Sequence, residues 1–266
     1  MKVIGQSFEI LEQTPSFEGM LKHIELCGRV SYKSEDLITK ESAAKFVDGL
    51  IKNGHTSVCE HGTVYIKKEH VPTLTPYDSL RTINGIPYVI TNWRRILNSE
   101  LRNMVPYFEF YNGDRITVRF ITNRAVANEF VRHRLFSFTQ ESTRYCNYSK
   151  VKFGSELTMI RPHWFSQDYT GESVNGLTQE EARWDKIMYE IEFNYNWLIK
   201  HGARTQDIRG ILPLDLKTDL IMTGTVNQWK QFFKLRSAND AHPQAKELSD
   251  ALKEEFINLD LMTFDN

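Results

Sequence analysis

The chain has 266 residues, 41% of them hydrophobic, which is ample for one sizeable core with room for a subdomain insert. Its 33 Lys and Arg residues nearly balance its 34 Asp and Glu residues, so the net charge of -1 excludes a global field that favours nucleic acid or an anionic membrane. No apolar run approaches the ~20 residues that span a bilayer, no signal-like segment opens the chain, and the three cysteines lack disulfide or zinc spacing, so we expect a soluble protein of the reducing cytoplasm.

The N-terminal part of the sequence predicts a strand, two helices and a second strand. Val3 to Leu11 alternates loosely enough for an edge strand. Ser16 suits the N-cap of a helix whose apolar residues recur at helical spacing as far as Val30. A second helix is expected from Glu41 to Lys52, and Thr63 to Lys68 alternates as a strand.

The segment from about 70 to 110 is longer than a typical connection and should carry structure of its own. Turns are expected at Pro72, Pro76 and Asn84-Gly85, and a short strand from Tyr88 to Ile90. Asn92 is the expected N-cap of a helix from Trp93 to Met104. Tyr107 to Tyr111 and Arg115 to Thr122 flank Asn112-Gly113-Asp114, which predicts a hairpin. We interpret 70 to 110 as an insert within one domain.

The stretch from Arg132 to Tyr145 combines three arginines and a histidine with hydroxyl side chains, and Phe136 and Phe138 can anchor its backbone. A guanidinium group meets a phosphate with two parallel charge-assisted bonds and stays protonated near neutrality. The stretch therefore suits the binding of an anion.

A helix capped by Asn123 leads into this stretch, and Val126 and Phe130 lie one turn apart on its inward face. The alternative for the arginines is therefore that they occupy a last helical turn, where cations suit the helix dipole. Glu129 lies three residues before Arg132 and four before His133, close enough to pair with either.

Downstream, the chain is polar and irregular from Lys150 to Gly176 and then strongly helical. Thr178 and Glu181 predict a capping box for a long aromatic helix to Gly202, whose apolar face suits either subunit packing or a deep core. Leu216 to Thr223 predicts a strand, and Thr225 opens a helix whose first turn should present backbone N–H groups to a phosphate.

The spacing Arg-His-Arg-x-x-Ser-x-x-x-x-Ser-x-Arg, from Arg132 to Arg144, resembles the signature of the flavin-dependent thymidylate synthases. It departs from the commonest family form at Thr139, where that form has Asn. Further blocks resemble family segments, namely Arg29 to Tyr32, Arg209 to Leu214, and Leu235-Arg236 followed by Ala241-His242. Short family members have far less between 70 and 110.

The segment from His55 to His61 allows several interpretations. Its residues lack the spacing that places metal ligands on one helical face, so we expect no metal site. Cys59 beside Glu60 suggests a thiolate nucleophile, but a buried inert thiol is the alternative, because sequence neighbours seldom face one another. The segment also resembles a family loop in which Ser57 contacts flavin, His55 lies near the flavin ring, and Glu60 and His61 give support.

The resemblance implies a flavin site and a nucleotide site built from distant parts of the sequence. The implied flavin-binding positions are Ser57, Arg132, His133, Arg134, Gln140, Thr225, Asn227 and Gln231. The implied substrate-binding positions, with Glu129 standing where the family usually has an amide, are Glu129, Arg132, Gln140, Glu141, Ser142, Thr143, Arg144, Arg209 and Arg236. Arg236 is the expected catalytic residue, because a guanidinium beside the uracil ring stabilises its anion. Arg209 would reach the substrate phosphate of a neighbouring subunit, and His242, ahead of Pro243, is either a ligand contact or a helix cap.

The resemblance also implies a fold and a reaction. The fold is a single α/β (α+β) domain over 1–266, with a central mostly antiparallel sheet flanked by helices, assembling as a homotetramer. FAD would take a hydride from NADPH, and reduced flavin would assist methylene transfer from 5,10-methylenetetrahydrofolate to dUMP, followed by reduction to dTMP. Cationic side chains must hold the phosphates, since the sequence has neither a Gly-x-Gly-x-x-Gly turn nor a Walker loop. No cysteine nucleophile is needed; the alternative is Cys146, whose pKa Arg144 could lower.

Two other classes of function compete with this hypothesis. A nucleic-acid-binding module would use Arg132 to Arg144 as a basic strip, with Phe136, Phe138 and Tyr145 stacking on bases. The balanced charge and the additional blocks speak against it, so we expect neither nucleic acid nor membrane as a partner. A structural oligomer without a ligand is the third class. Flavin uptake distinguishes the enzyme from both.

Overall fold

The computed structural model describes residues 1–150, 154 and 156–262. Over these residues the chain is a mixed α+β protein with two four-stranded antiparallel sheets and one short parallel pair of strands. The central sheet has the order β2-β7-β10-β8, formed by β2 (Ser7–Leu11), β7 (Arg115–Asn123), β10 (Lys217–Thr225) and β8 (Ser137–Gln140). The second sheet has the order β4-β5-β3-β6, formed by β4 (Ser79–Ile83), β5 (Ile86–Asn92), β3 (Thr63–Lys67) and β6 (Phe108–Glu109).

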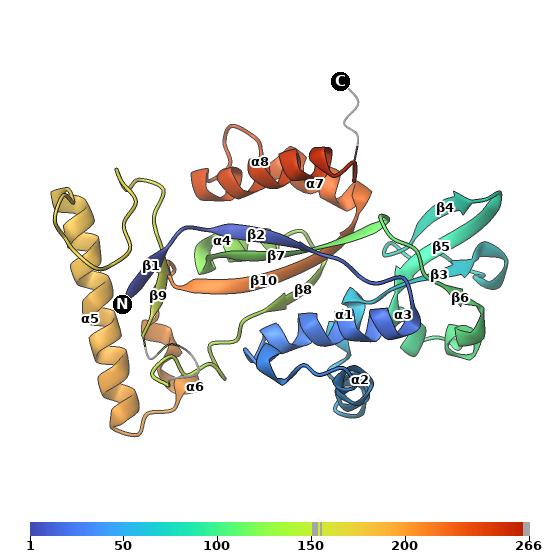
Figure 1. Ribbon diagram of the computed structural model, residues 1–266, viewed down its shortest axis with the longest axis horizontal. Coiled ribbons are helices and arrows are strands. Elements are labelled where there is room, and N and C mark those ends of the chain that lie inside the picture. The colour runs from blue at the N-terminus through green and yellow to red at the C-terminus, as the bar shows by residue number, and fades with distance from the viewer. Residues whose placement is uncertain (151–153, 155, 263–266) are drawn as a thin grey trace.

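Helices flank both faces of the central sheet, as Figure 1 shows. One face carries α4 (Arg124–Phe130), α7 (Val226–Arg236) and α8 (Pro243–Asn258), and the other carries α1 (Phe17–Val30) and α2 (Ser42–Lys52). The alternation of β10 explains this layering, because successive side chains of a strand point to opposite faces. Leu220 and Met222 pack in the cluster beneath α7 and α8, whereas Ile221 packs against Cys27 and Val30 of α1.

The helix starts expected at Ser16, Asn123 and Thr178 are confirmed by their caps. Asn123 accepts a hydrogen bond from the backbone N–H of Val126 at 2.8 Å, and Ser16 accepts one from Gly19 at 2.9 Å. Thr178 forms its capping box with Glu181 at the start of α5 (Gln179–Lys200). The remaining short helices and 3-10 turns are α3 (Trp93–Leu97), α6 (Thr205–Ile208), η1 (Glu35–Leu37), η2 (Thr56–His61), η3 (Lys68–His70), η4 (Glu100–Tyr107) and η6 (Arg209–Ile211).

The predicted hairpin around Asn112-Gly113-Asp114 is wrong. Gly113 does adopt a positive φ of 94°, but the turn joins two different sheets. β6 pairs with β3, while β7 pairs with β2 and β10. Turn residues determine where the chain reverses, but the partners that bury both faces of a strand determine its pairing, and the buried Val118 and Phe120 of β7 belong to the central sheet.

Two other predicted elements differ in extent. The expected strand from Val3 to Leu11 is two strands, because β1 (Lys2–Ile4) leaves the central sheet to run parallel with β9 (Thr158–Ile160), inside the stretch expected to be irregular. The expected helix from Trp93 to Met104 ends at Leu97, and Ser99 is extended, with φ −137° and ψ 169°. Ser99 Oγ bonds to the backbone oxygen of Ile96, a local bond that competes with the helix.

The long helix α5 packs one face against a separate cluster and leaves another exposed. Trp184, Met188 and Tyr195 are buried, whereas Phe193 and Trp197 are 64% and 51% exposed. Figure 1 shows α5 at the edge of the molecule, beside β1 and β9. Across the described part of the chain, the structure has no helix with the length and apolar character needed to cross a membrane.

Candidate active site

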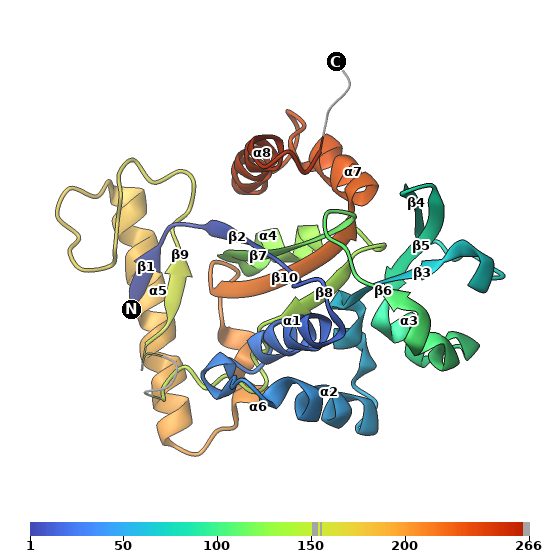
Figure 2. The same cartoon turned by 45° about the vertical axis from the view of Figure 1, so that its right-hand side comes forward.

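A groove of about 700 Å³ runs between α7, the loop ahead of β8 and the strand β4. Figure 2 shows β4 facing α7. The groove brings together six of the residues predicted to bind flavin, namely Arg132, His133, Arg134, Thr225, Asn227 and Gln231. The strand register brings these two segments together, because the start of β8 lies beside the end of β10, with Ser137 opposite Thr223.

Aromatic anchors shape the loop that carries the arginines. Phe130 ends α4 fully buried, and Phe136 is 5% exposed against the same core. Between these anchors Arg132 and Arg134 are exposed on the groove side. The helix ends at Phe130, so the arginines do not occupy its last turn.

The first turn of α7 offers fewer free donors than expected. Thr225 N bonds to Gln228 Oε1 at 2.7 Å, and Gln228 N bonds back to Thr225 Oγ1 at 3.3 Å. The N–H of Val226 donates to the backbone oxygen of Asp114 at 3.3 Å. The expectation of a turn open to phosphate is therefore wrong for these three donors, and the polar side chains of Asn227 and Gln231 take their place on the groove.

Arg236 forms the centre of a polar triad beside the groove. Its Nη1 pairs with Glu129 Oε2 at 2.7 Å, its Nη2 donates to the backbone oxygen of Glu129 at 2.6 Å, and its Nε donates to His133 Nε2 at 3.0 Å. Glu129 therefore pairs with Arg236, and not with either neighbour that the helical spacing suggested. Burial, together with the charge of Arg236, lowers the pKa of His133 to about 4. His133 thus remains a neutral acceptor for Arg236 near pH 7.

The second half of the signature lies at the other end of β8. The four residues of β8 separate the two halves, which at the usual rise places them roughly 13 Å apart. Gln140 Nε2 donates to Thr218 Oγ1 at 3.3 Å, and the backbone N–H of Ser142 donates to Ser31 O at 3.0 Å. Arg144 is exposed, and the ring of Tyr145 packs at a tilt against that of Tyr32, with centroids 4.8 Å apart. The block Arg29 to Tyr32 therefore supports the signature.

Arg209 lies on the same side as Arg144. Thr205 Oγ1 donates to the backbone oxygen of Arg144 at 2.7 Å, which places α6 against the signature loop. Arg209 begins η6 directly after α6 and is exposed. Within the described residues, Arg132 and Arg134 thus lie at the groove, and Arg144 and Arg209 lie at the far end of β8.

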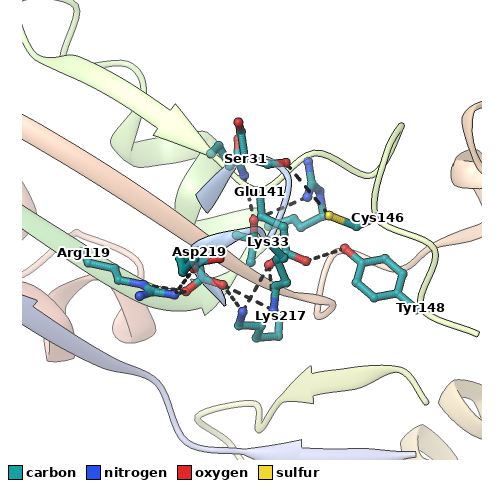
Figure 3. Close-up of polar contacts among 12 residues, drawn as sticks. Ser31, Lys33, Arg119, Glu141, Cys146, Tyr148, Lys217 and Asp219 are labelled. Atoms are coloured by element: carbon teal, nitrogen blue, oxygen red, sulfur yellow. Dashed lines mark hydrogen bonds and ion pairs between the residues drawn. The ribbon is translucent and has the colours of Figure 1, made fainter. Parts of the chain in front are cut away.

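Glu141 and Thr143 point away from solvent. Glu141 is 1% exposed and accepts hydrogen bonds from Tyr148 Oη at 2.8 Å and Lys217 Nζ at 3.1 Å. Figure 3 shows these residues in a buried network that also contains Lys33, Arg119 and Asp219. Burial opposes ionisation of Asp219, but Lys217 and Arg119 outweigh it and lower the pKa of this carboxyl. We call Lys33, Arg119, Glu141, Tyr148, Lys217 and Asp219 the buried ion cluster.

The segment from His55 to His61 folds as a 3-10 turn beside β8. Glu60 pairs with Arg94 at 2.5 Å, and Ser57 is exposed and does not line the groove. His61 is fully buried, with Nε2 2.9 Å from Thr139 Oγ1 and Nδ1 2.7 Å from Thr223 Oγ1. Thr139, the residue at which the signature departs from the common form, is therefore a partner of His61.

Two sets of residues that lie beside these sites were not predicted from the sequence. Lys217 and Asp219 are two residues apart on β10, a spacing that places both side chains on the same face of the strand. The residues from Leu74 to Leu80 line the groove, but no motif predicts this, because they lie in the segment from 70 to 110 that we interpret as an insert.

A family model described as thymidylate synthase complementing protein matches residues 113–259, which is more than half of the chain. The chain belongs to the flavin-dependent thymidylate synthase family. The match covers β7, both halves of the signature, β10 and α7. The second sheet, between residues 63 and 109, lies outside it.

Family members of known name share this half of the chain. The flavin-dependent thymidylate synthase of Pyrococcus furiosus is 30% identical over 138 residues, which are 52% of this chain and 52% of that protein. A probable flavin-dependent thymidylate synthase of Paramecium bursaria Chlorella virus 1 is 27% identical, over 53% of this chain and 66% of that protein. The chain thus spans about half to two thirds of the length of these curated relatives.

Among solved structures, the chain is similar to a UMP/dUMP methylase, PolB from Streptomyces cacaoi, crystallised with 5-Br UMP. The two are 15% identical with a TM-score of 0.48, and the similarity covers 97% of this chain and 92% of that one.

Proposed function

We propose that the chain is a flavin-dependent thymidylate synthase that methylates dUMP to dTMP. The one-carbon unit would come from 5,10-methylenetetrahydrofolate and the reducing equivalents from NADPH through FAD, in the cytoplasm. The observation that carries the proposal is the groove that gathers Arg132, His133, Arg134, Thr225, Asn227 and Gln231 from two distant parts of the sequence. Its volume of about 700 Å³ falls within the range of small-molecule sites.

The chemistry of the groove fits FAD. Arg132 and Arg134 are exposed guanidinium groups, which suit the two phosphates of the cofactor. Leu135 and Leu235 are 47% and 50% exposed beside them and offer apolar surface to a ring. When bound, FAD would supply the hydride chemistry that amino-acid side chains lack. The protein would supply position, charge and exclusion of water.

Arg236 is the proposed catalytic residue. Its guanidinium would lie along the pyrimidine ring and stabilise the negative charge that makes C5 nucleophilic. The bonds to Glu129 and His133 use three of the five N–H donors of the guanidinium and hold it in one orientation. This arrangement supports the role, since a donor aimed before reaction needs no reorganisation during it.

A mechanism without a cysteine nucleophile is supported by the state of the thiols. Cys27, Cys59 and Cys146 are free and buried. Burial, together with the charge of Glu141, raises the pKa of Cys146 to about 12. Burial likewise raises the pKa of Cys59 to about 11. Neither thiol has the thiolate character that attack on the pyrimidine requires.

The separation of the signature's halves supports a homotetramer whose sites are shared. Arg132 and Arg144 lie at opposite ends of β8, and this separation suits a site in which two copies each contribute one of the two arginines. We propose that Arg144 and Arg209 of one copy hold the phosphate of dUMP at the groove of another. The exposed aromatic face of α5 supports an additional subunit contact.

The decisive experiment combines flavin uptake with product analysis. Purified protein should bind FAD, and conversion of dUMP to dTMP should require FAD, NADPH and 5,10-methylenetetrahydrofolate together. Protein that fails to take up FAD and forms no dTMP would overturn the proposal. Salt-sensitive binding of RNA or DNA would favour the nucleic-acid module instead, but Phe136 is buried in the core and is not free to stack on bases.

Sharing of the site is tested by mixing two variants. Arg132→Ala and Arg144→Ala should each lose activity alone. After subunit exchange, about a quarter of randomly mixed sites should combine an intact groove from one copy with an intact Arg144 from another, restoring part of the activity. No recovery, with mixed oligomers demonstrated by mass spectrometry, would place both arginines of each site in one copy.

A further inference from the structure

The second sheet supplies one wall of the groove although it lies outside the family match. Its contribution comes from the segment Leu74 to Leu80, which leads into and begins β4, and which we call the insert wall. Figure 2 shows β4 standing across from α7, and the lining residues Leu80 and Leu235 belong to these two elements. The insert therefore forms part of the boundary of the proposed flavin site.

A buried carboxylate holds the insert wall rigid. The side chain of Asp78 is 0% exposed and pairs with Arg95 Nη1 at 2.6 Å. Asp78 Oδ2 also accepts from Thr75 N at 2.6 Å and from Thr75 Oγ1 at 3.0 Å. Arg95 in turn donates from Nη2 to the backbone oxygen of Thr73 at 2.7 Å. These bonds tie the loop ahead of β4 to α3, so that the wall has a defined shape.

Asp114 fixes the insert wall relative to α7. Its Oδ2 accepts from Arg81 of β4 at 2.6 Å and from Tyr65 of β3 at 2.8 Å. Its backbone oxygen accepts from Val226 N, in the first turn of α7, at 3.3 Å. One residue therefore bonds to both sides of the groove, and the distance between the two walls is set by protein contacts before any ligand binds.

Both sides of the groove present exposed leucines, and Arg132 and Arg134 also line it. Leu74 and Leu80 are 41% and 56% exposed on the insert wall, and Leu135 and Leu235 are similarly exposed on the other side. Exposed leucines on two fixed sides of one groove suit a flat ring, and the neighbouring Arg132 and Arg134 suit its anionic tail.

We propose that the insert wall is a ring-binding surface for the FAD of this chain, with Leu74 and Leu80 packing against a planar ring of the cofactor. This inference rests on the proposed function and adds to it a specificity element that the matched half of the chain lacks. It assigns a role to the insert, namely to complete the cofactor site from outside the shared family core.

The test is FAD affinity, measured by fluorescence titration of the purified full chain. Leu80→Asp places a charge on the ring surface and should raise the Kd for FAD at least tenfold. Thr82→Asp makes the same change in charge two residues along β4, at an exposed position outside the groove, and should change the Kd less than twofold. Leu74→Asp repeats the test on the other side of Asp78. The melting temperature without FAD checks that each variant is folded.

The same titration with FMN identifies the ring. Weaker binding of both FAD and FMN to Leu80→Asp would assign the wall to the flavin ring, and weaker binding of FAD alone would assign it to adenine. Folded Leu80→Asp and Leu74→Asp variants that bind FAD like the parent chain would overturn the inference while leaving the proposed function standing. A parent chain that does not bind FAD would overturn both.

Discussion

At the scale of single residues, the triad of Glu129, His133 and Arg236 shows how neighbours determine what a side chain can do. The guanidinium of Arg236 is half-buried and receives its orientation from a carboxylate, a carbonyl and a neutral imidazole. His133 can accept the bond from Nε only while its Nε2 is unprotonated, and its lowered pKa keeps it so at neutral pH. Glu129 therefore holds Arg236 through both its carboxylate and its backbone oxygen.

The first prediction concerns Arg236. We expect Arg236→Ala to retain FAD and to lose exchange of the uracil C5 hydrogen by a factor of about 100 or more, because one aimed donor of this kind has an effect of that size. Release of tritium from [5-³H]dUMP measures the exchange. Lys230→Ala, on the same helix, is the control and should exchange normally. Exchange that persists in Arg236→Ala would show that another group polarises the ring.

The second prediction concerns the thiol closest to the signature. Cys146 lies 4.0 Å from the backbone oxygen of Ser31, is fully buried and has a pKa raised to about 12 by burial. We expect Cys146→Ala to lose at most about 1–2 kcal/mol of stability and to keep dTMP formation within about twofold. A folded Cys146→Ala protein without activity would restore the covalent mechanism.

At the scale of secondary-structure elements, β8 and the buried ion cluster organise the second half of the signature. β8 carries the chain away from the groove, and Glu141 then turns inward to Lys33 and Lys217. The backbone N–H of Glu141 donates to Asp219 O at 2.9 Å, so β10 holds this loop by its backbone as well as by charge. Arg144 is exposed because the residues before it are anchored.

The third prediction tests that anchor. Lys217→Met should lower the free energy of unfolding by about 3–5 kcal/mol, because it leaves the buried Glu141 with Lys33 at 3.5 Å as its cationic partner and leaves Asp219 with Arg119 as its main one. Lys22→Met is the matched control, since its pair with Glu18 is exposed at 49% and 71%, and it should leave the free energy of unfolding nearly unchanged. Urea unfolding at pH 7.5 measures both. Equal small losses would mean that the cluster contributes little to stability.

At the scale of the whole molecule, a chain of hydrogen bonds crosses the interior from α1 to β8. His23 Nε2 lies 3.0 Å from Thr117 Oγ1, Thr117 lies 2.7 Å from Thr223, and Thr223 and Thr139 both bond to His61. Burial lowers the pKa of His23 to about 4, with Arg115 acting in the same direction. Burial also lowers the pKa of His61, assisted by the charges of His23 and Arg115.

The fourth prediction follows from these two histidines. A histidine whose pKa is lower in the folded chain gives stability that is complete above its unfolded pKa of about 6.5 and is lost as the pH falls toward the folded value. We expect the pair to contribute a loss of about 3 kcal/mol in unfolding free energy between pH 7.5 and pH 5.5. His23→Gln keeps an amide near Thr117 but cannot titrate, so it should lose about 1 kcal/mol less over the same interval. An unchanged pH dependence in His23→Gln would contradict the assignment.

Helix starts could be predicted from the sequence wherever a capping residue marks them. Caps at Ser16, Asn123, Thr178 and Thr225 predicted the starts of four helices, because a cap involves residues only three apart. The hairpin at Asn112-Gly113 was mispredicted, because a turn does not determine which strands pair after it.

The sequence by itself determined the family of this protein, the anchors and arginines of the signature and most helix boundaries, all of which depend on residue type and short spacing. Only the tertiary structure decided that β8 separates Arg132 from Arg144, that Glu129 pairs with Arg236, and that Leu74 and Leu80 close the groove. The physical reason is that these arrangements join residues far apart in the chain, and packing of whole sheets and helices, which no local pattern records, determines which of them meet.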